Sequence, residues 1–145
     1  MTLASLEQRA VALILDIVVL ASCLLLFFTA GALQALFRSD SGDEDLSDAV
    51  VYTWIVTTLV WLLFVPVYYI VLWAWRGQTI GKMATHIQVV QDDGSDLTLG
   101  RAVLRFVAYI ASALPLSIGL AMAFFDSDRR ALHDRIAHTL VVELE

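Results

Sequence analysis

One carboxylate lies inside an apolar stretch of the sequence, and it is the residue with the clearest chemical meaning. Asp16 falls within the first long hydrophobic segment, which runs from about Ala10 to Phe37. A carboxylate deep in a membrane helix costs about 2.5 to 3.5 kcal/mol on insertion scales, so it should face the protein interior or water and mark a functional site. Three interpretations stay open for Asp16: an ion or proton site, a polar staple between helices, or a residue that reaches the headgroups.

The partner of Asp16 has to come from a distant part of the chain. Arg9 lies on the same helical stripe seven residues earlier, but two turns separate these positions by about 10.5 Å and helix side chains lean toward the N-terminus. We therefore expect Arg9 to extend toward the headgroups. Asp16 would then be satisfied by Arg101, by Arg105 or by the cluster 133–135, or it would stay protonated.

A second group of polar side chains lies near the C-terminus. Its members are Arg129, Arg130, His133, Asp134, Arg135 and His138. Positions 130, 134 and 138 are spaced i, i+4, so a short helix would carry them on one face, with Asp134 paired to a neighbouring arginine. The two histidines are five residues apart and point away from each other on a helix, which argues against a metal site. The His133–Asp134 pair gives only slender support to an enzyme acting on lipid headgroups, so we expect no enzyme.

Glycines flank a polar loop that follows the second hydrophobic segment, Gly77-Gln78-Thr79-Ile80-Gly81-Lys82. Three residues separate the glycines where a phosphate-binding P-loop has four, and Met83 stands where that loop has Ser or Thr. We interpret the stretch as a turn into a short helix at the membrane surface, capped by Thr79 and with Lys82 at the headgroups. The run 92–96 lacks the carboxylate spacing of a calcium loop. The sequence predicts no cofactor and no metal.

The composition places these residues in a membrane protein. Hydrophobic residues make up 59% of the 145 positions and charged residues 17%, with a mean hydropathy of +0.77, whereas soluble domains are about 25% charged. Three apolar segments follow, at about 10–37, 50–75 and 102–125, the third kinked or re-entrant at Pro115. The net charge of −6 gives no reason to expect a nucleic-acid partner. The aromatic residues placed as interfacial anchors of the second segment are Tyr52, Trp54, Trp73 and Trp75.

The basic residues predict the orientation in the bilayer. Arg9 precedes the first segment, and the loop between the second and third segments carries Arg76, Lys82, Arg101 and Arg105. The positive-inside rule therefore places the N-terminus and this loop in the cytoplasm. A third complete span would carry the C-terminal arginines outside, whereas a re-entrant hairpin would keep them inside, and both arrangements stay open.

Two short stretches have the pattern of strands. Residues 86–91 alternate and are rich in valine, 139–143 are similar, and Thr98 can cap a helix that starts at Leu99. The predicted fold is an all-α membrane protein with three hydrophobic helical segments and a small cytoplasmic two-stranded β element. The whole chain, 1–145, forms a single domain in this prediction.

Several short motifs together resemble the RDD family of small prokaryotic membrane proteins, which is named for one arginine and two aspartates. The motifs are Ala4-Ser5-x-x-x-Arg9 followed by Asp16, the loop Arg76-Gly77-Gln78-Thr79-x-Gly81-Lys82, the stretch Leu97-Thr98-Leu99-Gly100-Arg101-Ala102-x-Leu104-Arg105, and the closing Arg129-Arg130-x-Leu132-His133-Asp134. The chain has His138-Thr139 where family members often carry Gly-Thr. The resemblance covers nearly the whole chain and implies an integral, multi-pass inner-membrane protein, with a role in transport proposed for the family.

Two functions are consistent with these residues. In the first, Asp16 binds a proton or a monovalent cation, Arg101 or Arg105 helps to release it, and Asp134 lies at the cytoplasmic mouth. Because three short segments barely enclose a path, this transporter is expected to be a homo-oligomer. In the second, the protein is a membrane scaffold or accessory subunit that does not transport, and its arginines and aspartates form a structural network.

Overall fold

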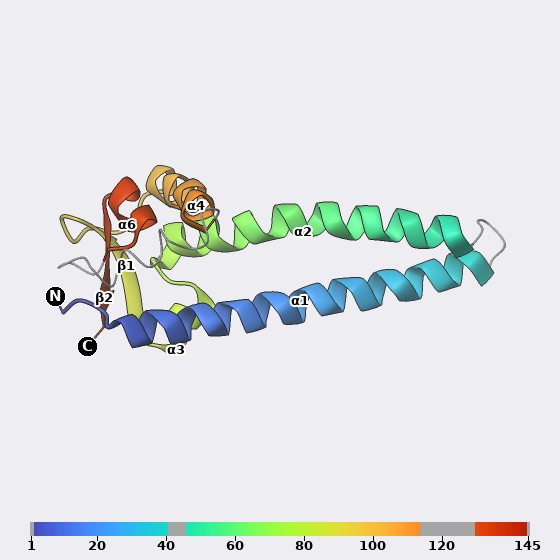
Figure 1. Cartoon of the computed structure of the whole chain (residues 1–145), viewed down its shortest axis with the longest axis horizontal. Helices are drawn as coiled ribbons and strands as arrows, with labels where there is room; N and C mark the ends of the chain where they lie inside the picture. Colours follow the sequence, from blue (N-terminus) through green and yellow to red (C-terminus); the bar gives the residue numbers. More distant parts are fainter. Residues whose placement is uncertain (1, 41–45, 114–129, 145) are drawn as a thin grey trace. The chain divides into compact units, whose positions relative to one another are not determined.

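The structure is a computed structural model, and it describes residues 2–40, 46–113 and 130–144. Its elements follow in the order α1 (Leu6–Asp40), α2 (Leu46–Arg76), α3 (Ile80–Ala84), β1 (Ile87–Gln91), α4 (Leu99–Ala113), α6 (Leu132–Ala137) and β2 (Thr139–Glu143) (Figure 1). They form two compact units, one made of Met1–Asp16 with Val67–Glu145 and the other of Ile17–Pro66. The two long helices each contribute to both units.

The unit Ile17–Pro66 is a pair of helical stretches, one from α1 and one from α2. The ring of Phe27 meets Trp61 and Phe64 edge-on, with centroids 6.3 and 5.6 Å apart. At Gly31 a β-carbon would lie only 2.6 Å from the Thr53 methyl group. The missing side chain therefore lets the two stretches approach closely, as small residues do between membrane helices.

Within the described residues, two helices are long and apolar enough to cross a membrane, Leu6–Phe37 and Asp48–Arg76. Only 11% of the most apolar stretch of each helix is buried. Leu26 and Leu63, for example, are 68% and 70% exposed. A helix whose exposed faces are apolar is more stable in lipid than in water. The predicted segments 10–37 and 50–75 are confirmed as helices, and α2 continues through Pro66.

The predicted third segment, 102–125, is described only in its first part. There α4 is amphipathic, since Arg105 and Ser112 are buried while Leu99 and Val107 are more than half exposed. The kink or re-entrant turn expected at Pro115 lies outside the described residues. The described ranges thus give two helices of membrane-spanning length, and a third hydrophobic span stays a prediction.

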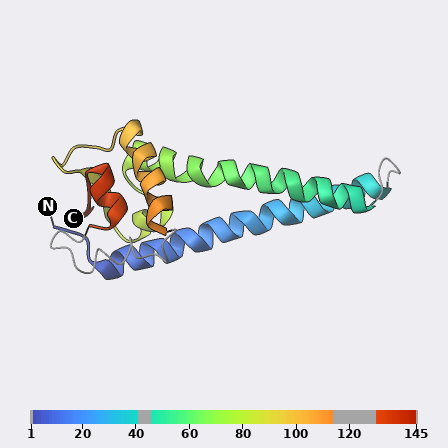
Figure 2. The same cartoon turned by 45° about the horizontal axis from the view of Figure 1, so that its top comes forward.

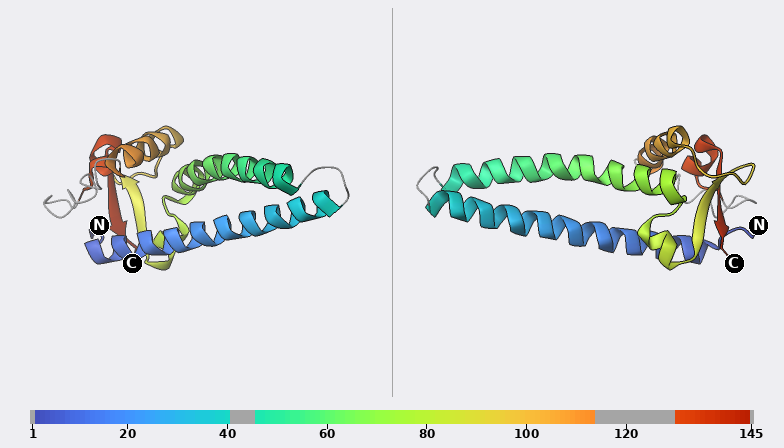
Figure 3. Two further views of the ribbon diagram at one scale, coloured as in Figure 1. Left: turned by 45° about the vertical axis from the view of Figure 1, so that its right-hand side comes forward. Right: turned by 180° about the vertical axis from the view of Figure 1, so that it is seen from behind.

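The two predicted strands pair as expected. β1 and β2 are antiparallel, with Val89 opposite Val141 in their register, and both valines are fully buried. The segment before α1 adds to this pair, because Leu3 forms a bridge with Val142 and the Ala4 amide donates to the Val141 carbonyl, so the start of α1 lies beside β2 (Figure 3). In the same unit α4 and α6 lie side by side (Figure 2). Thr98 accepts a hydrogen bond from the Arg101 amide, so the predicted cap of α4 is confirmed.

Candidate functional site

Asp16 is buried, and three neutral donors satisfy its carboxylate. Oδ1 accepts hydrogen bonds from the Tyr68 hydroxyl and the Gly81 amide, each at 2.8 Å, and Oδ2 accepts one from the Thr79 hydroxyl at 2.6 Å. The side chain therefore joins α1 to the end of α2 and to α3. The prediction that an arginine or the cluster 133–135 satisfies Asp16 is wrong, because these nearby hydroxyl and amide groups already occupy the carboxylate.

The loop before α3 is shaped to present these donors. Thr79 is the N-cap of α3, where its hydroxyl accepts from the Lys82 amide while it donates to Asp16, so the predicted cap is confirmed. Gly81 approaches α1 so closely that a β-carbon would lie 2.0 Å from the Ala12 carbonyl oxygen. Gly77 ends α2 in the left-handed region, at φ +65°. Gln78 donates to the Ile87 carbonyl and ties the loop to β1.

Asp134 is the centre of a second network, which is ionic. Its Oδ2 lies 3.0 Å from Nη1 of Arg9, and its Oδ1 lies 2.5 Å from Nη2 of Arg105. Oδ2 also accepts from the Ala131 amide at the start of α6, and Arg105 further donates to the Thr139 hydroxyl. Burial raises the pKa of Asp134, but the interactions with Arg105, His133 and Arg9 outweigh it and lower the pKa to about 2. The carboxylate is therefore ionised at every physiological pH.

Three basic residues lie elsewhere than the sequence predicted. Arg9 does not extend to the headgroups, because the Asp134 carboxylate binds it and leaves its side chain only 14% exposed. Arg130 does not share a helical face with Asp134, since α6 begins only at Leu132, and it pairs with Asp92 at 3.2 Å. Arg101 donates to the backbone carbonyls of residues 137 and 138. These contacts require pairings between distant segments, which helical spacing alone does not reveal.

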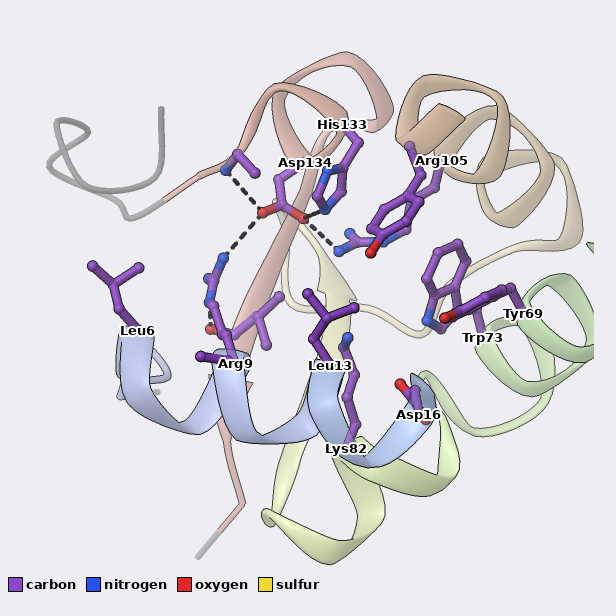
Figure 4. Close-up of a pocket in the computed structure, with 14 residues that line it drawn as sticks. Leu6, Arg9, Leu13, Asp16, Tyr69, Trp73, Lys82, Arg105, His133 and Asp134 are labelled. Atoms are coloured by element: carbon purple, nitrogen blue, oxygen red, sulfur yellow. Dashed lines mark hydrogen bonds and ion pairs between the residues drawn. The ribbon is translucent and has the colours of Figure 1, made fainter. Parts of the chain in front are cut away.

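Both carboxylates line one cavity of about 200 Å³ (Figure 4). Its charged walls are Arg9, Asp16, Lys82, Arg105 and Asp134, and its aromatic walls are Tyr69, Trp73, Tyr109 and His133. Leu6, Ala10, Leu13, Ala131 and Val141 supply the rest of the lining. The structure thus brings together Asp16, Asp134, Arg9, Arg105 and Lys82 from four different helices, and it leaves Arg101 and Arg130 outside.

Lys82 points into this cavity, and not to the headgroups as predicted. Figure 4 shows its side chain rising from α3 past Leu13. Within the described residues the Lys82 ammonium makes no ion pair and no hydrogen bond. Burial and the charge of Arg105 lower its pKa to about 8, although Asp16 and Asp134 act in the opposite direction. The amine can therefore gain or lose a proton close to physiological pH.

The lowered pKa of His133 predicts how the stability of the fold depends on pH. Burial lowers its pKa from 6.5 to about 3, so the folded protein holds it neutral. Below pH 6.5 the unfolded chain binds a proton that the folded chain does not, so stability falls as the pH drops from 6.5 toward 3. Between pH 6.5 and 4 the loss is about 3 kcal/mol at roughly 1.4 kcal/mol per pH unit. The free energy of unfolding in detergent, measured at a series of pH values, tests this loss.

The matched variants for this measurement are His133→Asn and His86→Asn. The first removes the buried titrating group and should flatten the curve between pH 6.5 and 4. The second removes an exposed histidine in the left-handed region, φ 53°, which asparagine tolerates. It should leave the slope unchanged. An equal slope in parent and His133→Asn would mean that His133 is not the group responsible.

Aromatic residues are the main part of the site that the sequence analysis missed. Tyr68 binds Asp16, and Trp73, expected as an interfacial anchor, is only 1% exposed. The Tyr69 ring lies 5.2 Å from Trp73 and 6.0 Å from Tyr109, between centroids. The sequence did contain one indication of them. Tyr68 and Tyr69 are adjacent in an apolar segment, and tyrosine hydroxyls need hydrogen-bond partners when they are buried. Trp75, in contrast, is 72% exposed, as an anchor would be.

Comparison with known proteins identifies the same family as the sequence motifs. The RDD family model matches residues 3–138. Among curated proteins, the uncharacterized protein YxaI of Bacillus subtilis (strain 168) is 32% identical over 116 residues, which are 79% of this chain and 76% of that protein. The uncharacterized protein RP437 of Rickettsia prowazekii (strain Madrid E) is 36% identical over 85 residues, 57% of this chain and 46% of that protein. The chain therefore spans about half the length of that relative. No solved structure matches significantly.

Two apolar helices of membrane-crossing length, together with a unit built around buried arginine and aspartate side chains, indicate a membrane protein with an internal polar site. The chain belongs to the RDD family, which covers nearly all of its length. The resemblance drawn from the motifs is thereby confirmed.

Proposed function

We propose that this protein is a multi-pass inner-membrane protein that transports an ion through the cavity, with Lys82 as the group that carries a proton. The observation that carries this proposal is the Lys82 ammonium, which enters the cavity and has no ion-pair partner among residues 2–40, 46–113 and 130–144. The charges of Asp16 and Asp134 act on the half-buried Lys82 without pairing with it, so the ammonium is available to exchange a proton.

The two carboxylates are fixed in this proposal, and the amine is the mobile element. Asp16 accepts three hydrogen bonds, and Asp134 is held between Arg9 and Arg105. A change of protonation at either one would break several contacts at once. Lys82 loses none of these contacts when it releases its proton, and a pKa of about 8 lets both forms coexist near neutral pH.

The membrane topology of the proposal follows from the basic residues. The N-terminus and the cavity lie on the cytoplasmic side, because Arg9, Arg101 and Arg105 belong to this unit. Neither the two spans among the described residues nor three short segments readily enclose a path through the bilayer, so the transporting form in this proposal is a homo-oligomer. A proton or a monovalent cation was the ion expected from Asp16, and the positive charge of Lys82 now makes the proton the better candidate.

Proton flux in liposomes tests the role of Lys82. Purified parent protein should acidify or alkalinise the lumen when a pH gradient is applied, with a rate that is highest near pH 8. Lys82→Arg keeps the charge but does not release a proton below pH 12, so its flux should fall to the level of empty liposomes. Lys82→Gln should be equally inactive.

Arg76→Gln is the matched control for these variants. Arg76 is an exposed basic residue at the end of α2 that lies over the Trp75 ring and outside the cavity. Its loss removes one positive charge, and the flux should stay within twofold of the parent. Parent flux no greater than that of empty liposomes, or a Lys82→Arg variant as active as the parent, would refute the proposal.

A membrane scaffold or accessory subunit is the second candidate, and the full hydrogen bonding of Asp16 favours it. In this case the carboxylate is a staple between α1, α2 and α3. Asp16→Asn places an amide, which has one acceptor oxygen, among three donors, so about 2 to 3 kcal/mol of stability should be lost. Thermal unfolding in detergent measures this loss.

Asp96→Asn is the control, since Asp96 is an exposed carboxylate in the loop before α4. It should leave the melting temperature within about 2 °C of the parent. If Asp16→Asn is as stable as the parent, the staple has no support. If it is destabilised while parent and variant both show no flux, the scaffold becomes the better description of the protein.

A further inference from the structure

We propose that the cavity binds a small oxyanion, held by the Lys82 ammonium and the Trp73 indole N–H. This inference rests on the proposed function, because it names the anion that would enter the cavity beside the proton that Lys82 carries. This class of anion includes a free phosphate or carboxylate ion and the phosphate of a lipid headgroup, which present the same oxygen atoms to the same donors.

The charge of the cavity favours an anion. Three cationic side chains line it, Arg9, Lys82 and Arg105, against two carboxylates, Asp16 and Asp134. His133 adds no charge, because burial lowers its pKa to about 3. The lining therefore carries one net positive charge, which a monovalent anion would balance.

The carboxylates have little left to offer a cation. Asp16 already accepts from Tyr68, Thr79 and Gly81. Asp134 is shared by two guanidinium groups. A cation that entered the cavity would have to displace these donors before it could reach a carboxylate oxygen. An anion would meet no such competition.

Two groups of the cavity that lack a partner among the described residues are donors, beside the neutral His133, whose Nδ1 is also without a partner there. Trp73 is 1% exposed and its Nε1 has no hydrogen-bond partner among the described residues. An indole and an ammonium can only donate, so both need an acceptor that the described part of the chain does not supply. Figure 4 shows the indole ring and Lys82 facing the same space, with Asp16 at its edge. The Arg105 guanidinium lies 5.1 Å above the Trp73 ring and extends the positive surface.

The size and walls of the cavity suit an anionic group that carries a small apolar part. Its volume is about 200 Å³, several times the space that one water molecule needs. Leu6, Leu13 and Val141 form apolar wall beside the charged residues. Water alone would satisfy the donors but would not balance the charge.

Lys82 offers a direct test, because it is the single lysine of the sequence. Reductive methylation with ¹³C-formaldehyde labels it and the N-terminal amine only. In nanodiscs of phosphatidylcholine, added sodium phosphate or sodium acetate should shift the Lys82 methyl resonance in a saturable way and raise the pH at which it titrates. An equal concentration of sodium chloride is the control for ionic strength.

Calorimetry on variants assigns the donors. Lys82→Gln should weaken the binding of phosphate at least tenfold, whereas Lys82→Arg keeps the charge and should stay within about threefold of the parent. Trp73→Phe keeps a ring but removes the N–H, and it should weaken binding several-fold even if Lys82→Gln does not fold. Arg76→Gln should bind as the parent does.

A second set of nanodiscs identifies the source of the anion. If phosphatidylglycerol in the bilayer raises the Lys82 titration point and blocks added phosphate, the lipid headgroup is the ligand. If phosphate binds equally in both bilayers, the ligand is a free ion. No saturable shift with phosphate, acetate or phosphatidylglycerol would overturn the inference, even if proton flux through Lys82 is observed. Anion binding without any flux would instead refute the proposed function and leave the binding site standing.

Discussion

Substituting Asp134 with asparagine is expected to lower the free energy of unfolding by about 3 to 5 kcal/mol, the range typical of removing one partner from a buried ion pair. Asp134 and Arg105 are each no more than 2% exposed at the side chain, and their charged atoms lie 2.5 Å apart. The asparagine would leave the Arg105 charge buried without an anion, and Arg9 would lose the same partner. Chemical unfolding in detergent micelles measures the difference.

Asp92→Asn is the matched control for this substitution. Asp92 also pairs with an arginine, Arg130, at 3.2 Å, but its side chain is 36% exposed. Water screens such a surface pair, so the loss should stay below about 1 kcal/mol. Similar losses in the two variants would mean that burial does not determine the strength of the Asp134 network.

Local patterns predicted those parts of the fold that local physics determines. The two long helices follow from long apolar runs, which are interrupted by charge only at Asp16. The strands 87–91 and 139–143 follow from alternation and β-branched residues, and the caps at Thr79 and Thr98 from a hydroxyl before a helix. Each of these signals lies within a few residues of the element that it predicts. The third hydrophobic segment stays a prediction, because most of it falls outside the described residues.

The partners within the site could not be predicted, because they depend on which distant segments meet. Opposite charge suggested that an arginine should satisfy Asp16, yet Tyr68, Thr79 and Gly81 do so. Several neutral hydrogen bonds can replace one counter-ion at a carboxylate, and sequence spacing does not show which solution a fold adopts. The Arg9–Asp134 pair joins positions 125 residues apart, so helical geometry within α1 contained no information about it.

The glycine at position 81 matters for a reason that the sequence did not reveal. In the loop motif it looked like part of a turn, but Gly81 lies inside α3, where its lack of a side chain allows contact with the α1 backbone. This contact positions the Gly81 amide on Asp16 and places the next residue, Lys82, at the cavity. The staple and the candidate ion site thus depend on the same close approach.

Gly81→Ala is therefore expected to destabilise the protein by at least about 3 kcal/mol. The added methyl group would lie 2.0 Å from the carbonyl oxygen of Ala12 and 3.0 Å from Cγ of Asp16. Backbone atoms cannot rotate away, so α3 has to move from α1, which combines the cost of overpacking with the loss of a hydrogen bond to a carboxylate. Thermal and chemical unfolding in detergent should both show the change.

Gly100→Ala separates this steric effect from the general effect of replacing glycine in a helix. Gly100 lies in the first turn of α4, and no atom lies within 4 Å of the position that its β-carbon would take. Alanine there reduces the freedom of the unfolded chain and favours the helix, so the variant should be as stable as the parent or up to about 1 kcal/mol more stable. Opposite signs for the two substitutions would locate the cost in the contact between α3 and α1. A Gly81→Ala variant that also matches or exceeds the parent would show that these helices do not approach each other as closely as this site requires.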